Sequence, residues 1–226
     1  VQVENEYGSY GEDKPYVSAI RDCLRGIYGK ELALFQCDWS SNFTKNGLDD
    51  LVWTMNFGTG SHIDNQFRHL KQLRPDSPLM CSEFWSGWFD KWGARHETRP
   101  AKDMVAGLDE MLSKGISFSL YMTHGGTSFG HWAGANSPGF QPDVTSYDYD
   151  APINEYGHAT PKYHELRNMM QKYSVKKLPS VPKPIAPIIT VPEFKLTEFA
   201  PLTNGADKTV NSKDTKTFED LDTGWG

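Results

Sequence analysis

Two glutamates occupy positions where carboxylates can act together. Glu6 follows Asn5 in the opening segment VQVENEYG, and Glu83 follows the apolar run PLMCS. Acidic residues and Asn are poor strand formers, so strand preference does not explain them in such segments. Hydrolysis of a glycosidic bond uses paired carboxylates, one to protonate the leaving oxygen and one to meet the anomeric carbon. The alternative is that each glutamate is an ordinary solvated or ion-paired residue.

The segments that must position these glutamates alternate between strand-like and helix-like patterns. Hydrophobic periodicity and boundary Gly and Pro residues define the elements. The predicted strands are 1–7, 32–39, 51–58, 78–85 and 116–126, and the predicted helices are 15–29, 44–52, 62–73, 100–115 and 160–173. Such alternation with short connections predicts a parallel sheet with helical crossovers. Side chains alternate along a strand, so Gln2, Glu4 and Glu6 are predicted to share one face of the strand at 1–7. In a (β/α)₈ barrel, Glu6 and Glu83 would lie at the carboxyl-end mouth, where active sites of such barrels form.

Two stretches depart from this alternation. The loop 123–159 is far longer than a usual strand-to-helix connection, and its Gly, aromatic and Asp content indicates a functional loop. We expect Asp148 and Asp150 within it to anchor the loop through hydrogen bonds rather than to bind a cation. Further on, PSVPKPIAPIITVPEFK has five prolines and no helical period. We therefore expect part of a catalytic domain at 1–175, then a linker and the beginning of a β-rich domain at 176–226.

Composition argues against several classes of function. The chain has 226 residues, of which 38% are apolar and 13% aromatic, so it can build a core and has aromatic rings that suit sugar faces. Its net charge of −6 and its lack of a basic tract argue against a nucleic-acid partner. No apolar run approaches the roughly 20 residues of a membrane span. Three scattered cysteines suggest neither a zinc site nor a disulfide framework.

Four sequence blocks carry a family resemblance. ENEYGSYG looks like the acid/base signature of clan A glycosidases and resembles in particular glycoside hydrolase family 35, the β-galactosidases. SEFWSGWFDKWG resembles the nucleophile segment of that family. LYMTHGGTSFGHWAGANSP and TSYDYDAPINEYG resemble two further blocks, in the right order. The likeness runs from Val1 to about Tyr173.

The resemblance implies a fold and an activity. The fold is α/β, a (β/α)₈ TIM barrel of which this chain supplies only the strands resembling the fourth to eighth, followed by the start of a β-rich region. The activity is retaining removal of terminal β-galactose from β-galactoside oligosaccharides or glycoconjugates by double displacement. This mechanism implies no metal and no cofactor. Two alternatives stay open: a related exo-β-glycosidase such as a β-glucosaminidase, and a non-catalytic carbohydrate-binding or inert fragment. The family also implies a secreted, periplasmic or lysosomal location. No signal segment is visible, and we expect that the N-terminus is missing.

The resemblance also assigns roles to single residues. Glu6 matches the acid/base, Glu83 the nucleophile, and Asn5 the residue that binds the sugar 2-hydroxyl. Three aromatic residues match sugar contacts: Tyr121 beside the nucleophile, Tyr149 on the long loop, and Trp85, where animal lysosomal members have tyrosine. We expect the loop 123–159 to form one wall of the sugar pocket, with Tyr149 and Trp132 facing the ligand.

Overall fold

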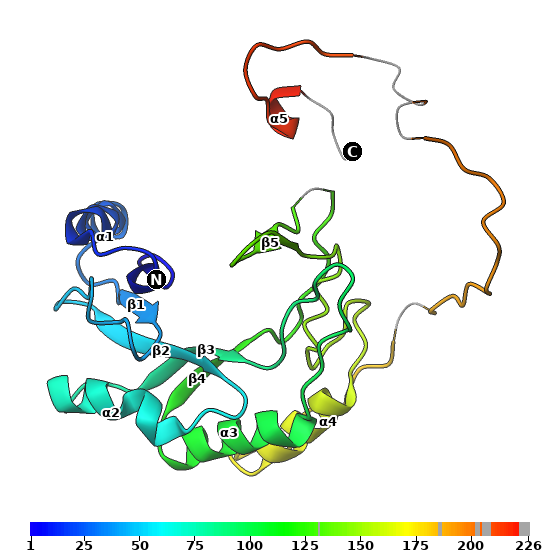
Figure 1. The fold of residues 1–226 in the computed structure, drawn as a ribbon. Coiled ribbons are helices and arrows are strands. Elements are labelled where there is room, and N and C mark those ends of the chain that lie inside the picture. Colours follow the sequence, from blue (N-terminus) through cyan, green and yellow to red (C-terminus); the bar gives the residue numbers. More distant parts are fainter. Residues whose placement is uncertain (131, 185–186, 202–203, 205–208, 222–226) are drawn as a thin grey trace.

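Four parallel strands form the central sheet of the protein (Figure 1). The computed structural model describes residues 1–130, 132–184, 187–201, 204 and 209–221. The strands are β1 (Phe35–Asp38), β2 (Val52–Gly58), β3 (Met80–Trp85) and β4 (Ser117–Tyr121). They lie side by side in chain order, and each neighbouring pair is parallel. Their carboxyl ends therefore share one edge of the sheet, as the sequence pattern predicts.

Four helices lie where the sequence predicts helices. They are α1 (Lys14–Tyr28), α2 (Ile63–Leu73), α3 (Ala101–Ser113) and α4 (Pro161–Gln171). The start of α1 is capped by the Asp13 side chain, which accepts a hydrogen bond from the Tyr16 backbone N–H, and Gly29 follows its last turn at a φ of 88°.

The helix predicted at 44–52 is wrong. The segment consists of turns and leads directly into β2. The Gln36 side chain accepts a hydrogen bond from the Leu48 backbone N–H at 2.8 Å, and the Trp53 indole donates to the Leu48 carbonyl at 2.8 Å. Because these side chains bind the backbone groups that a helix would use, the local structure is a loop packed on β1.

The main core lies between the sheet and the helices α2, α3 and α4. Fully buried side chains from each layer meet there, including Met55, Phe67, Phe84, Leu108 and Met169. Contact between helix and strand is close at Gly107, where a side-chain carbon would come within 2.7 Å of the Phe84 ring. This packing holds β2 and β3 rigidly, and β3 carries Glu83.

The opening segment follows β1 only briefly, so the strand predicted at 1–7 is wrong beyond Val3. The Val3 N–H donates to the Phe35 carbonyl at 2.8 Å, and the Phe35 N–H donates to Val1 at 3.0 Å. The backbone then enters the left-handed region at Glu4 (φ 60°) and at Glu6 (φ 53°). A short 3₁₀ helix, η1 (Tyr7–Ser9), follows. Strict alternation of side chains therefore ends at Val3.

The left-handed turn at Glu4 redirects its side chain. The Glu4 carboxylate accepts a hydrogen bond from the Tyr16 hydroxyl on α1 at 2.5 Å. The Glu6 carboxylate instead bonds to groups that belong to β2 and to the end of β1. The shared face that alternation predicts for Gln2, Glu4 and Glu6 is therefore not formed.

The loop 123–159 is ordered by its own contacts. It contains a small antiparallel hairpin of β5 (Ala135–Asn136) and β6 (Gln141–Pro142). Asp148 accepts a hydrogen bond from the Glu155 backbone N–H at 2.9 Å, and Asp150 accepts one from the Arg99 backbone N–H at 2.6 Å. The predicted anchoring role of these two aspartates is confirmed.

The segment after α4 runs away from the sheet in Figure 1. Its described residues contain the short helix α5 (Phe218–Leu221) and no strand, and parts of 176–226 lie outside the described residues. The predicted boundary near 175 and the β-rich region beyond it stay predictions. Among the described residues, no helix combines the length and apolar character needed to cross a membrane.

Candidate active site

The Glu6 carboxylate is held by two donors on one of its oxygens. Glu6 Oε1 accepts hydrogen bonds from Trp39 Nε1 at 3.0 Å and from Asn56 Nδ2 at 2.9 Å. The Glu6 backbone N–H donates to the Cys37 carbonyl at 3.2 Å, which fixes the turn against β1. Glu6 therefore has a defined position even though it lies outside regular strand structure.

The Glu83 carboxylate lies near the carboxyl end of β3 and is half-buried. Glu83 Oε2 accepts a hydrogen bond from Trp85 Nε1 at 3.1 Å. Burial raises the pKa of the Glu83 carboxyl, the Trp85 hydrogen bond opposes this, and the charge of Glu6 raises the pKa further. Burial acts in this direction because it disfavours the charged form.

The structure brings the two glutamates together around Asn56. Asn56 on β2 pairs in register with Glu83 on β3, and its amide donates to Glu6. The two indoles that bind the carboxylates also meet, since the Trp39 and Trp85 rings lie 6.0 Å apart at an angle of 67°. Within the part of the chain that the structure describes, Glu6 Oε2 and Glu83 Oε1 have no hydrogen-bond partner. Each carboxylate thus has one oxygen held by indole or amide donors and one oxygen without a partner among the described residues.

Asn5 lies beside this pair and is exposed. Its Oδ1 accepts hydrogen bonds from Gln2 Nε2 at 2.9 Å and from the Cys37 thiol at 3.3 Å. Burial raises the pKa of the Cys37 thiol to about 11, so the thiol keeps its proton at neutral pH. Because both contacts use Oδ1, the Asn5 amide nitrogen has no partner among the described residues and can donate to a ligand.

An aromatic cluster lies on the Glu83 side of the site. The Tyr121 hydroxyl is 3.0 Å from the Tyr147 hydroxyl, and Tyr149 packs against both rings with centroid distances of 5.4 Å. Burial raises the pKa of Tyr147 and of Tyr149, and the charge of Glu83 adds to both shifts. These tyrosines are therefore neutral hydroxyl groups near the Glu83 carboxylate.

Tyr149 is held in an unusual backbone conformation. Its φ is 60° and that of Asp150 is 48°, a region that costs non-glycine residues free energy. Lys162 Nζ binds the Asp150 carbonyl at 2.8 Å and the Asp150 carboxylate at 2.5 Å. Gly87 lies directly beneath, where a side-chain carbon would be 1.8 Å from the Tyr149 carbonyl oxygen. The tyrosine is thus fixed by its neighbours, and it is 2% exposed.

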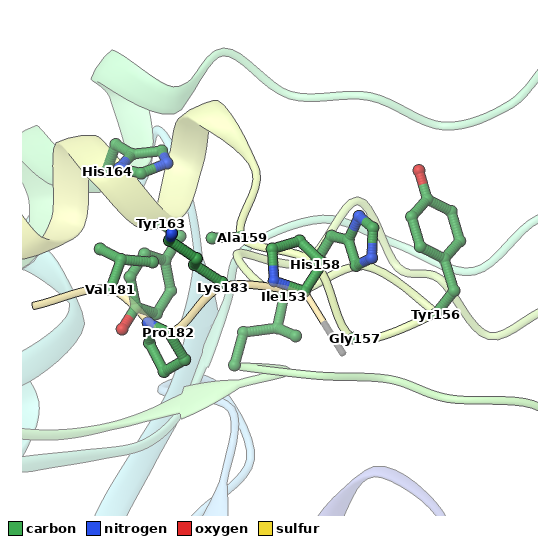
Figure 2. A pocket seen from close by; sticks show the side chains of 11 residues that line it. Ile153, Tyr156, Gly157, His158, Ala159, Tyr163, His164, Val181, Pro182 and Lys183 are labelled. Atoms are coloured by element: carbon green, nitrogen blue, oxygen red, sulfur yellow. The ribbon is translucent and has the colours of Figure 1, made fainter. Parts of the chain in front are cut away.

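Other features of the long loop lie apart from the glutamates. Trp132 is 69% exposed, so its predicted contact with a ligand stays a prediction. A separate cavity lies between the loop residues Tyr156 and His158, the start of α4 at Tyr163, and the segment 181–184 (Figure 2). None of the predicted site residues lines this cavity.

Comparison with known proteins identifies the family. The family model described as "Glycosyl hydrolases family 35" matches residues 1–173. The chain belongs to this family. It is 40% identical over 209 residues to mouse "Beta-galactosidase-1-like protein", and the aligned region covers 92% of this chain and 31% of that protein. It is 44% identical over 187 residues to human "Beta-galactosidase", and this alignment covers 81% of this chain and 27% of the human protein. The Xanthomonas manihotis "Beta-galactosidase" is 39% identical over 208 residues, covering 89% and 34%.

The chain therefore spans about a third or less of the length of these family 35 relatives. The matched residues 1–173 contain the sheet, the four long helices and every predicted site residue. Among the described residues, no three His, Cys, Asp or Glu side chains form a group that could hold a metal ion.

Four residues of the candidate site were not predicted from the sequence. They are Cys37, Trp39, Asn56 and Tyr147. Asn56 did give a signal, because it is a polar residue inside the apolar strand VWTMNFG and is 2% exposed. A buried amide needs hydrogen-bond partners. Because Asn56 lies on the strand next to Glu83, those partners are expected among the residues of the site.

Proposed function

We propose that the full protein carrying this chain is a retaining glycoside hydrolase that removes terminal β-galactose from β-galactoside oligosaccharides or glycoconjugates. One observation carries the proposal. Glu6 and Glu83 come from distant parts of the chain and flank the same asparagine, and each has one carboxylate oxygen without a partner among the residues that the structure describes. Family 35 relatives that bear the name β-galactosidase support the choice of sugar.

The two carboxylates take different roles in double displacement. Glu83 attacks the anomeric carbon and forms a covalent glycosyl-enzyme, while Glu6 gives its proton to the departing glycosidic oxygen. Glu6 then removes a proton from water, the water attacks the anomeric carbon, and the bond to Glu83 breaks. In retaining enzymes the two carboxyl groups lie about 5 Å apart. Glu6 and Glu83 both lie next to the Asn56 side chain, which is consistent with such a short separation.

The other residues bind and orient the sugar. The amide nitrogen of Asn5 donates to the sugar 2-hydroxyl, a contact that strengthens as the oxocarbenium character of the transition state develops. Trp85 orients Glu83 through its indole N–H and offers its ring to the ligand. Tyr121 supplies an aromatic surface beside the nucleophile, and Tyr149, which is 2% exposed, packs against the Tyr121 ring and supports it.

The raised pKa of Glu83 sets an acid limit for this mechanism. Glu83 must be ionised to attack, and burial makes ionisation harder than for a solvated carboxyl. Activity therefore falls on the acid side at a higher pH than an ordinary glutamate would give.

The parallel segments of this chain correspond to part of the family barrel. The Val1–Val3 segment and the strands β1 to β4 give five parallel segments in chain order, which we align with the fourth to eighth strands of a (β/α)₈ barrel. A β-rich domain then follows the Pro-rich linker. We extend the family resemblance to a secreted, periplasmic or lysosomal place of action.

Trapping of the covalent intermediate tests the assignment. A 2-deoxy-2-fluoro β-galactoside with a good leaving group should label the full-length protein, and peptide mapping should find the label on Glu83. The Glu83→Gln variant should take up no label, whereas Glu6→Gln should still be labelled by the activated reagent. A label on any other residue overturns the nucleophile assignment.

A panel of aryl glycosides tests the sugar. We expect turnover of the β-galactoside well above that of the β-glucosaminide. Faster hydrolysis of the glucosaminide would favour the alternative glycosidase, and no turnover or labelling with any glycoside would favour a carbohydrate-binding or inert protein.

A further inference from the structure

A hydrogen bond from Ser82 fixes the orientation of the Asn56 side chain. Asn56 is 2% exposed on β2, and its Oδ1 accepts a hydrogen bond from the Ser82 hydroxyl at 2.6 Å. Ser82 is 2.6 Å from the Thr54 hydroxyl, and both hydroxyl groups are buried. The Thr54 hydroxyl also lies 3.1 Å from the Gln36 carbonyl, so its single proton can go either to Ser82 or to that carbonyl. With its Oδ1 bound by the Ser82 hydroxyl, Asn56 turns its NH₂ group toward Glu6.

The Glu6 carboxylate therefore receives two donors on the same oxygen. Trp39 Nε1 is a donor only, and the Asn56 NH₂ group is likewise a donor. Both bind Glu6 Oε1, at 3.0 Å and 2.9 Å. An oxygen that accepts two N–H groups has no room for a proton of its own, so a protonated Glu6 carries its proton on Oε2.

We propose that Asn56 and Trp39 form a two-donor clamp that confines the transferable proton of Glu6 to Oε2, with Asn56 oriented by Ser82. This inference rests on the proposed role of Glu6 as acid/base. Asn56 is a positioning residue in this account, because it acts through Glu6 and not on the substrate. The clamp serves both halves of the reaction, since it fixes the direction of proton delivery and stabilises the Glu6 anion that later activates water.

The ionisable neighbours of Glu6 do not replace this clamp. Glu83 on β3 bears a like charge and disfavours a second anion. Cys37 on β1 stays a neutral thiol because burial raises its pKa to about 11. Asp38 accepts hydrogen bonds from the Gly8 and Trp39 backbone N–H groups at 2.7 and 2.8 Å. The donors that favour the Glu6 anion are therefore the uncharged groups of Trp39 and Asn56.

The Asn56→Asp variant tests the proposal in the full-length protein. It has nearly the same shape but replaces the NH₂ donor with an acceptor, so the Glu6 anion loses a donor and gains a repulsive neighbour. We expect the pKa of Glu6 to rise by about one unit or more, which moves the alkaline limb of the kcat/KM profile upward. The rate with a poor leaving group should fall about tenfold more than the rate with an activated aryl galactoside, because proton delivery is misdirected.

Two variants separate positioning from loss of structure. Trp39→Phe removes the other donor and keeps an aromatic ring beside Trp85, and we expect it to shift the same pH limb in the same direction. Asn46→Asp places the same substitution at another buried asparagine, which donates to the Gly11 carbonyl at 3.2 Å and does not contact Glu6. It should lower stability without moving the pH profile. The clamp would be overturned if Asn56→Asp left the alkaline limb of the kcat/KM profile in place and slowed the poor-leaving-group substrate and the activated aryl galactoside equally.

A direct titration separates this inference from the proposed function. The carboxyl ¹³C signal of Glu6, assigned through its loss in Glu6→Gln, reports the pKa without any turnover. A higher pKa in Asn56→Asp than in the wild type supports the clamp even if no glycoside is hydrolysed. An unchanged Glu6 pKa rejects the clamp even if the wild type proves to be a β-galactosidase.

Discussion

Replacement of Lys162 by methionine should destabilise the wall of the site. Lys162 is 4% exposed, and its Nζ donates to the Ser86 carbonyl at 2.8 Å and to both the carbonyl and the carboxylate of Asp150. Methionine fills a similar volume but donates nothing. The change leaves two carbonyl groups without this donor and the Asp150 carboxylate without its cation. The residue thus ties the end of β3 to the loop that carries Tyr149.

The structure sets the expected size of this effect. Removing one partner of a buried ion pair costs about 3–5 kcal/mol. The Asp150 carboxylate keeps a hydrogen bond from the Arg99 backbone N–H and is partly exposed, which favours the lower end, about 3 kcal/mol. For a protein domain of about 150–250 residues, about 3 kcal/mol corresponds to a fall in Tm of about 6–12 °C.

Chemical and thermal denaturation measure this loss, and two variants control it. Lys172→Met removes an exposed lysine that pairs with Asp109, and we expect a change below about 0.5 kcal/mol. The double variant Lys162→Met with Asp150→Asn should recover part of the loss, because no unpaired charge remains. Loss of the Lys162 hydrogen bonds to Asp150 should also loosen the backbone at Tyr149 and raise KM for the galactoside. A Lys162→Met loss no larger than that of Lys172→Met would refute the reasoning.

Three further predictions follow from the site and the core. The folded-state pKa of Glu83 is raised, so its ionisation weakens folding as pH rises from the unfolded value of about 4.3 through the folded value. Glu83→Gln should therefore raise Tm at pH 7 and leave it unchanged near pH 3, and an equal change at both pH values would contradict the burial argument. Glu6→Ala should slow substrates with poor leaving groups by at least about tenfold more than activated aryl galactosides, and an equal loss on both would count against its acid role. Gly107→Ala should cost about 1–3 kcal/mol in urea denaturation, because the added carbon would lie 2.7 Å from the Phe84 ring, and a neutral result would show that the helix shifts freely.

The order and type of the main elements could be predicted from the sequence. Apolar stripes with Pro and Gly boundaries marked the helices at 15–29 and 100–115 because these signals act within a few residues. The helix predicted at 44–52 failed because Gln36, a residue on β1, captures the Leu48 backbone N–H. Such a contact depends on how the chain folds back on itself, and local propensity does not contain it.

The opening segment shows the same limit at the site itself. Alternation along a strand predicted a common face for Glu4 and Glu6, but left-handed turns at both residues end the alternation. These turns lie where the Gly8 backbone N–H donates to the Asp38 carboxylate at 2.7 Å and the Glu6 N–H donates to the Cys37 carbonyl. Both partners lie about 30 positions further along the chain, so no window around Glu6 could reveal the turns.

The sequence by itself determined the family and selected the two carboxylates as candidates, because residue types and short motifs are local information. It also indicated that both would come to one edge of a parallel sheet, since all strands of such a sheet end on the same side. Only the tertiary structure decided which oxygen of each carboxylate is held and which has no partner among the described residues. That choice depends on the Trp39 and Trp85 indoles and on the register that places Asn56 beside Glu83. Hydrogen bonds of about 3 Å between side chains from different strands exist only once the strands are packed, and those bonds give the two carboxylates their separate environments.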